Sequence, residues 1–292
     1  MDRRKASLKL KLICFPFFIL PRPLKKAVAF FWTTIWFLVI RFRVEETRER
    51  VRRALPDKTE KEVNYIAFYS LYNLILTFFE LSYRAFGKKH IYKYTKVKNI
   101  EYLKESIKGD RPVFLFTGHL ANGEVILSRV CYEGVPLHLI AKRVRNAFLD
   151  AIVFEAREVS GLVHIPPKNA LSEIMGCIKK KAPLVFLHDQ YMRPPKGVKT
   201  TFMGLPVFTN PSVAKFALKN NAMVIPVNLY RENSNTVVEF EPEIPLEKKF
   251  PDFEDNVVHM TQIFNDWLTD KVTKRPDEWM WIHRRFKNPL KK

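Results

Sequence analysis

The fold is decided near the middle of the chain, where the apolar run Val113-Phe114-Leu115-Phe116 precedes Gly118-His119-Leu120-Ala121-Asn122-Gly123-Glu124. A short, continuously apolar run of this kind is typical of a strand that is buried on both faces. His119 and Glu124 have four residues between them, and residues at that spacing do not share a helix face. Asn122-Gly123 is a turn-prone pair, so the sequence predicts a turn between the histidine and the glutamate.

This pair of residues has a chemical interpretation and a plain one. A carboxylate that holds an imidazole fixes its tautomer and raises its basicity, which a general base for hydroxyl activation requires. A histidine near a glutamate is more often a surface pair or a satisfied, partly buried histidine. The position at the end of a predicted strand favours the catalytic interpretation, because open α/β sheets bind their ligands there.

Short apolar segments alternate with helical segments from about residue 97 onward. We expect strands at 113–116, 137–141, 163–165, 184–188, 223–229 and 236–240. Helices are expected near 124–131, 146–159, 169–180 and 211–219, with a final amphipathic helix near 255–272. Several of the strands are continuously apolar, so the sequence predicts an α/β fold with a mostly parallel central sheet flanked by helices.

Residues 1–96 are predicted to form a separate N-terminal helical region, and residues 97–292 the α/β domain. The first part contains an uncharged run at 27–40, rich in Phe and Trp, with basic residues on both sides. This run is short for a spanning helix, which needs about 20 residues, and it lacks the cleavage site of a signal peptide. Its pattern is typical of an anchor at an anionic membrane face. The alternative is a buried core helix.

The balance of charge predicts an anionic partner. The 292 residues include 50 Lys and Arg against 30 Asp and Glu, a net charge of +20, which suits nucleic acid, anionic lipid or an acidic protein. Three scattered cysteines, Cys14, Cys131 and Cys177, have no metal-ligand spacing and predict no disulfide framework, as in a reducing compartment. The sequence has no metal or nucleotide motif, so we expect no cofactor.

Three further motifs lie in the α/β region. Leu187-His188-Asp189-Gln190 stands at a predicted strand end and precedes Thr201-Phe202-Met203-Gly204-Leu205-Pro206. Lys142 begins a basic cluster after the strand at 137–141, and Arg157 lies one helix later. The third motif is Pro276-Asp277-Glu278-Trp279-Met280-Trp281-Ile282-His283-Arg284-Arg285-Phe286-Lys287. Taken singly, these motifs have ordinary explanations as a helix cap, a solvated face and core aromatics.

Together the motifs resemble the late acyltransferases of lipid A biosynthesis, the lauroyl/myristoyl transferase family. This family is related to the glycerolipid acyltransferases, which carry a His-x4-acid motif. The resemblance covers nearly the whole chain, from the aromatic N-terminal run to the Trp-x-Trp-x-His-Arg-Arg-Phe-Lys segment. The chain departs from the family at Gly123, where an aromatic residue is common, and at Lys142, where arginine is common. Related enzymes acylate other glycolipids, so the acceptor does not follow from the resemblance.

The resemblance implies a membrane-bound enzyme at the cytoplasmic face of the inner membrane. It would move a fatty acyl chain from acyl carrier protein to a hydroxyl of a lipid A precursor or related glycolipid. His119 would take the hydroxyl proton, and Glu124 would orient the ring. The oxyanion could be met by Arg157 or Lys142, or by backbone N–H groups near the helix start after Gly118. Candidates for binding the substrate or the oxyanion are Asn122, Lys142, Arg157, Asp189, Gln190, Arg284 and Arg285.

Two other functions fit part of the pattern. A glycerol phosphate or lysophospholipid acyltransferase shares the His-x4-acid chemistry, but the segment from Trp279 to Lys287 argues against it. A basic nucleic-acid-binding protein would explain the charge and the aromatic content. Its aromatic residues would interleave with Lys and Arg, whereas here they cluster in apolar runs, so we expect no nucleic-acid partner.

Overall fold

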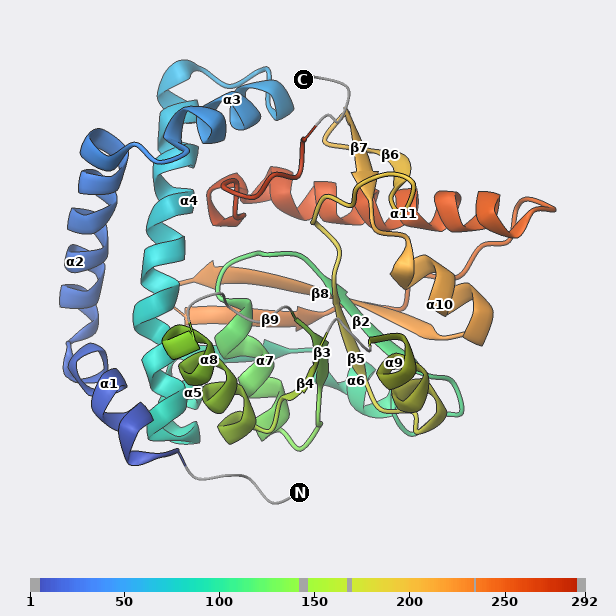
Figure 1. Ribbon diagram of the computed structural model, residues 1–292, viewed down its shortest axis with the longest axis horizontal. Coiled ribbons are helices and arrows are strands. Elements are labelled where there is room, and N and C mark those ends of the chain that lie inside the picture. Colours follow the sequence, from blue (N-terminus) through green and yellow to red (C-terminus); the bar gives the residue numbers. More distant parts are fainter. Residues whose placement is uncertain (1–5, 142–146, 167–169, 234, 288–292) are drawn as a thin grey trace.

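The computed structural model describes residues 6–141, 147–166, 170–233 and 235–287. Its centre is a seven-stranded sheet in the order β1-β9-β8-β2-β5-β3-β4 (Figure 1). The pairs β1–β9, β8–β2, β2–β5, β5–β3 and β3–β4 are parallel, whereas β8–β9 is antiparallel. The strands are β1 (Thr95–Lys98), β2 (Val113–Thr117), β3 (His138–Ile140), β4 (Val163–Ile165), β5 (Leu184–Leu187), β8 (Met223–Glu232) and β9 (Asn235–Phe240). The predicted α/β fold with a mostly parallel sheet is confirmed.

Helices cover both faces of the sheet. All five residues of β2 are buried, which explains its continuously apolar sequence. The Phe116 ring lies 5.0 Å from Phe264 on one face, whereas Leu115 on the other face lines a small cavity together with Ile126. The helices of this part are α6 (Ile100–Ser106), α7 (Gly123–Tyr132), α8 (Ala147–Ser160), α9 (Ala170–Lys179), α10 (Ser212–Asn220) and α11 (Phe253–Lys274). The five helices from α7 onward match the expected ranges to within a few residues.

Three strands were not predicted. The hairpin of β6 (Val198–Phe202) and β7 (Leu205–Thr209) forms its own two-stranded sheet. Its turn consists of Met203 and Gly204, which both have positive φ angles, as the commonest tight hairpin turns require. The short edge strand β1 alternates lysine with other residues and carries little apolar signal. The predicted boundary between residues 96 and 97 lies inside β1, and the division into two domains stays a prediction.

Residues 8–94 form a set of helices beside the sheet, in which α2 lies along the long helix α4 (Figure 1). Helix α4 begins with a capping box between Thr59 and Glu62, which satisfies two otherwise unpaired N–H groups. The elements are α1 (Leu8–Ile19), α2 (Arg22–Ile35), a π-helix (Trp36–Ile40), α3 (Val44–Ala54), α4 (Glu60–Leu81), a 3-10 helix (Ser82–Phe86) and α5 (Lys88–Tyr94).

The apolar N-terminal run is largely exposed. Helix α2 and its π-helical extension, Arg22–Ile40, form the one stretch among the described residues that is long and apolar enough to cross a membrane. Side chains such as Phe31, Trp32 and Val39 are half to three-quarters exposed, although burial is what apolar groups favour in water. An exposed apolar surface of this kind marks a contact with a membrane or a partner. The alternative of a buried core helix therefore does not describe this segment.

Candidate active site

The loop between β2 and α7 carries His119 and is held from outside by the C-terminal segment, which we define as residues 276–287. Leu120 forms a β-bridge with Trp279, and the Ala121 N–H donates to the Glu278 carbonyl at 2.9 Å. The N–H of Met280 donates to the carbonyl of His119 at 3.1 Å. The chain turns here, as the sequence predicts, and the turn is fixed by strand-like pairing with residues far away in the sequence.

Helix α4 supports the other side of the C-terminal segment. The Ser70 hydroxyl donates to the Trp279 carbonyl at 2.6 Å, and the Asn73 amide donates to the Asp277 carbonyl at 3.0 Å. Trp279 and Trp281 are fully buried, in agreement with their interpretation as core aromatics. The segment therefore lies between α4 and the His119 loop and leaves the loop little freedom to move.

Asp189 holds His119. Its carboxylate accepts from the ring Nδ1 at 2.7 Å, from the backbone N–H of His119 at 2.7 Å and from Trp279 Nε1 at 2.8 Å. Asp189 follows β5, which pairs in parallel with β2, so the two residues meet at the carboxyl edge of the sheet. A Cβ atom at Gly118 would lie 3.2 Å from Asp189 Oδ2, so glycine permits this close approach.

The electrostatics of this pair suit a general base. Burial alone would lower the pKa of His119, but the charge of Asp189 and its hydrogen bond more than offset burial and raise the pKa. Burial opposes ionisation of Asp189 as well, yet the interaction with His119 holds the Asp189 pKa far below its usual range. An ionised carboxylate only accepts hydrogen bonds, so Nδ1 carries the proton and Nε2 keeps its lone pair when the ring is neutral.

Glu124 does not hold the ring of His119, and this part of the prediction is corrected. Its oxygens accept from Arg157 at 2.5 and 3.1 Å and from Arg84 at 3.0 Å. Burial would raise the pKa of Glu124, but the two guanidinium groups lower it to about 2. Glu124 lies in the first turn of α7, where its side chain meets arginines from the 3-10 helix after α4 and from α8.

Two further candidates, Arg285 and Asn122, make hydrogen bonds that stabilise the fold. Arg285 is buried and donates to Gln190 O, Thr209 Oγ1 and Asn265 Oδ1 at 2.8 to 3.1 Å, which ties the segment after β5 to α11. Asn122 is also buried and caps α7 by accepting from the Val125 N–H at 3.2 Å. Arg284 is exposed. Lys142 lies outside the described residues.

The three backbone N–H groups directly after Gly118 are already bonded within the protein. Those of His119, Leu120 and Ala121 donate to Asp189, Gly118 and Glu278, respectively. These three groups are therefore engaged, and the expectation that N–H groups at the start of α7 could meet an oxyanion stays a prediction. Exposed Gln190 places its amide nitrogen 3.5 Å from His119 Nε2.

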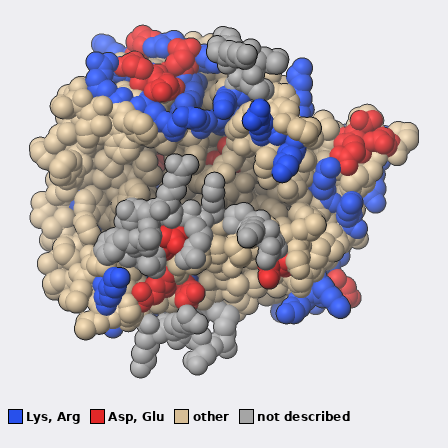
Figure 2. All heavy atoms as spheres, viewed as in Figure 1, with Lys and Arg blue, Asp and Glu red and all other residues tan. Residues whose placement is uncertain are grey.

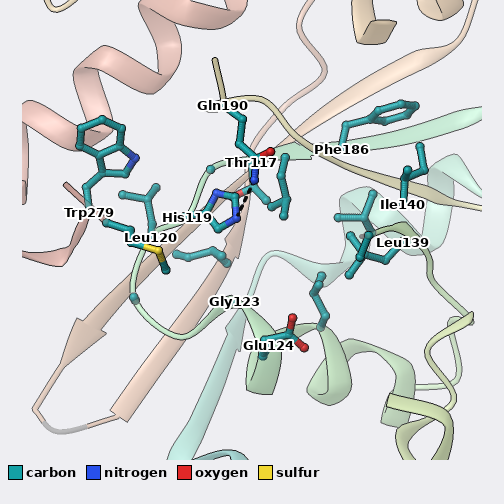
Figure 3. Close-up of a pocket in the computed structure, with 18 of the residues that line it drawn as sticks. Thr117, His119, Leu120, Gly123, Glu124, Leu139, Ile140, Phe186, Gln190 and Trp279 are labelled. Carbon is teal, nitrogen blue, oxygen red and sulfur yellow. Dashed lines mark hydrogen bonds between the residues drawn. The ribbon is translucent and has the colours of Figure 1, made fainter. Parts of the chain in front are cut away.

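A cavity of about 550 Å³ opens beside His119. Leu139, Ile140 and Phe186 lie on one side of it, and Glu124 lies on the opposite side of the histidine from Gln190 (Figure 3). The lining also includes polar side chains from α4 and the C-terminal segment, namely Ser70, Asn73, Thr77 and Glu278. The cavity thus combines an apolar part with a polar part, and its volume is in the range of small-molecule sites.

Two residues near the cavity were missed in the sequence. Arg84 is a single charge in the otherwise uncharged run Leu81-Ser82-Tyr83-Arg84-Ala85-Phe86, and this isolation was the available signal. The ring of His283 lies 4.5 Å from that of His119, and burial, helped by the charge of His119, lowers the pKa of His283 to about 4. In the sequence, the only sign of His283 is its position two residues after Trp281. Among the described residues, no group of three or more His, Cys, Asp or Glu is placed to hold a metal ion.

The fold is a mostly parallel sheet flanked by helices, and a His119–Asp189 pair lies at the carboxyl edge of this sheet. A family model for bacterial lipid A biosynthesis acyltransferases matches residues 11–288, and the chain belongs to this family. A search of curated proteins found no match. The predicted family and enzyme class are confirmed. Lipid A acyltransferases are membrane-associated, which agrees with the exposed apolar surface of α2.

Proposed function

We propose that this enzyme transfers a fatty acyl chain from acyl carrier protein to a hydroxyl of a lipid A precursor, with His119 as the general base. The observation that supports this proposal most is the orientation of the His119 imidazole ring. Asp189 occupies Nδ1 of His119, while His119 lines the cavity and Nε2 lies beside the exposed Gln190. An alcohol needs such a base, because it is a weak nucleophile at neutral pH.

The reaction would proceed in two proton transfers. His119 Nε2 takes the proton of the acceptor hydroxyl while its oxygen attacks the thioester carbonyl. Asp189 remains ionised and stabilises the imidazolium. Collapse of the tetrahedral intermediate breaks the carbon–sulfur bond, and the imidazolium gives its proton to the leaving thiolate. The products are an ester and a free thiol, and no covalent enzyme intermediate is formed.

Two side chains could stabilise the oxyanion. Gln190 supplies an amide donor beside His119 Nε2. Arg157 lines the cavity, and together with Arg84 it places two positive charges on the single carboxylate of Glu124. The remaining positive charge would attract the oxyanion or a phosphate of the acceptor.

The two parts of the cavity suit the two substrates. An acyl chain would lie against Leu139, Ile140 and Phe186, where it leaves water. A sugar acceptor would face the side with Ser70, Asn73 and Glu278. In this arrangement the thioester carbonyl and the acceptor hydroxyl meet at His119.

The surface offers places for the membrane and for an acidic carrier protein. The apolar side chains of α1 and α2 would enter the cytoplasmic leaflet of the inner membrane. Lys and Arg side chains gather over α3, where Asp and Glu side chains lie among them, and over the neighbouring end of the β6–β7 hairpin (Figure 2). Exposed members near these elements are Arg53, Arg193, Lys196, Arg284 and Lys287. Such a patch would speed the encounter with an acidic protein.

A purified assay tests the proposal. The enzyme is incubated with acyl carrier protein thioester and either a lipid A precursor or glycerol 3-phosphate, and products are identified by mass spectrometry. We expect one added acyl chain on the lipid A precursor and none with His119→Ala. Acylation of glycerol 3-phosphate alone would show that the acceptor is wrong. Equal rates with coenzyme A thioesters at low salt would remove the argument for the carrier protein.

A further inference from the structure

Glu80 is a buried carboxylate that the mechanism above does not use. It lies in the last turn of α4 and is 3% exposed. Its oxygens accept from Arg231 Nη1 and Nη2, both at 2.9 Å, and from Asn122 Nδ2 at 2.8 Å. A bidentate arginine already compensates the charge of Glu80, so the additional bond to Asn122 is not needed for that purpose.

This carboxylate reaches the His119 loop from two directions. Through Asn122 it contacts the residue that caps α7, whose Oδ1 accepts from the Val125 N–H. Its other partner, Arg231, lies on β8, and the backbone N–H of Arg231 donates to Glu278 Oε2 at 2.8 Å. Glu278 in turn accepts from the Ala121 N–H through its carbonyl. The consecutive residues 121 and 122 are therefore both connected to Glu80.

The contact also fixes which way the Asn122 side chain faces. Its amide nitrogen donates to Glu80, so its oxygen is directed to the helix N-terminus. Asn122 is fully buried, and without Glu80 its amide nitrogen would lose its partner in a place that water does not reach. Asn122 is followed by Gly123 and Glu124, so a shift of the cap would move Glu124 and the loop that carries His119.

We propose that Glu80 is a positioning residue for the acyl transfer: acting through Asn122, it holds the His119 loop and the start of α7 in the reactive geometry. This role rests on the proposed function. It also gives Asn122 a task other than substrate binding. Misplacement of a catalytic group by about 1 Å can cost on the order of 10²-fold in rate.

The test separates the Glu80 contact from the helix cap. In Asn122→Ser the hydroxyl can still cap α7, because serine is a good N-cap residue, but it is too short to reach Glu80. We expect kcat to fall on the order of 10²-fold, with the KM for the acyl carrier protein thioester and the thermal midpoint close to wild type. Glu80→Gln should lower kcat at least as much, because it also weakens the pair with Arg231. The double variant should lose no more than the larger single loss, because both changes act on the connection between Glu80 and Asn122.

A matched control is Glu243→Gln, which weakens another arginine–carboxylate pair, Arg111 with Glu243, near the amino end of β2. We expect this variant to lose stability and to keep its kcat. A wild-type kcat in Asn122→Ser would overturn the proposal, as would fully additive losses in the double variant.

Amide hydrogen exchange makes the test independent of the substrate. We expect faster exchange for residues 119–125 in Asn122→Ser and no change there in Glu243→Gln. Unchanged exchange of this loop would overturn the positioning role. If the wild-type enzyme acylates no lipid A precursor, the proposed function fails, and the exchange experiment still decides whether Glu80 holds the loop.

Discussion

Asp189 and Glu124 are two carboxylates near the same cavity, and they have different partners. Asp189 is fully buried and contacts His119, whose charge depends on pH. Glu124 has 28% of its side chain exposed and contacts Arg84 and Arg157, which are always charged. Asp189 can raise the pKa of His119, whereas Glu124 mainly holds the side chains of Arg84 and Arg157 in place. The comparison shows that the acid close to the histidine in the sequence is not the acid that holds it in space.

The largest effect on kcat should come from removing His119, which contacts Asp189 and not Glu124. His119→Ala should lower kcat by roughly 10⁴-fold, the upper end of general-base catalysis, because the variant loses the imidazole that Asp189 orients beside the cavity. Steady-state kinetics with the carrier protein thioester measure this loss. Near wild-type turnover in a protein free of contaminating enzyme would refute the mechanism.

Asp189→Asn should be the next most damaging change. The amide can donate to Nδ1 and so stabilise the wrong tautomer, in which Nε2 carries the proton. We expect kcat to fall by about 10³-fold, within the range of positioned base catalysis. Circular dichroism checks that the variant is folded. A smaller loss than in Glu124→Gln would reverse the assignment of the two carboxylates.

Glu124→Gln should lower kcat by about 10²-fold, because the donors of Arg84 and Arg157 lose their charged partner and shift. It should also reduce the free energy of unfolding by about 3 kcal/mol, since Arg84 is fully buried and would lose its compensating charge. Urea unfolding and kinetics on the same preparation measure both effects. Asp189→Asn should move the acid limb of the pH profile further than Glu124→Gln, because Asp189 raises the pKa of His119 more than Glu124 does.

The pH profile sharpens the comparison further. The base acts only when His119 is neutral, so kcat/KM should rise with pH through the pKa of His119. This pKa is raised, so the midpoint should lie above the ordinary value of about 6.5. In Asp189→Asn the raising charge is absent, and the midpoint should move to lower pH. An unchanged midpoint in that variant would mean that another group titrates.

The smallest effect on kcat is expected from substitutions to aspartate on α2 and its extension, far from the cavity. Phe31 and Leu38 are exposed on α2 and its extension, and changing both to Asp should weaken membrane binding while kcat in detergent stays near wild type. Flotation with anionic vesicles measures the binding. The unaltered enzyme should stay on membranes in high salt, since apolar burial is not screened. Release of the unaltered enzyme by salt alone would contradict an apolar anchor.

The sequence predicts the sheet well, because its buried strands and helices carry local apolar patterns. It also predicts His119 just after a strand, as the structure has it, and it includes Asp189 among the candidates without its structural task, the contact with His119. That task depends on the pairing of β2 with β5, which places residues 70 positions apart side by side and leaves no local signal. Arg285 was misread for a related reason, since a conspicuous arginine in a motif can be buried as a structural donor. The β6–β7 hairpin escaped detection because its short strands are partly polar.

The ribosome makes the chain from its N-terminus, so the C-terminal segment is the last part of the site to be synthesised. Helix α2, with its exposed apolar side chains, is synthesised early, whereas Trp279 is made more than 200 residues later. Until Trp279 is present, Asp189 lacks its indole donor and the His119 loop lacks its β-bridge. A growing chain can therefore associate with lipid before its site is assembled. Under the proposed function, the thioester would then meet a finished base only after the enzyme has reached its lipid acceptor.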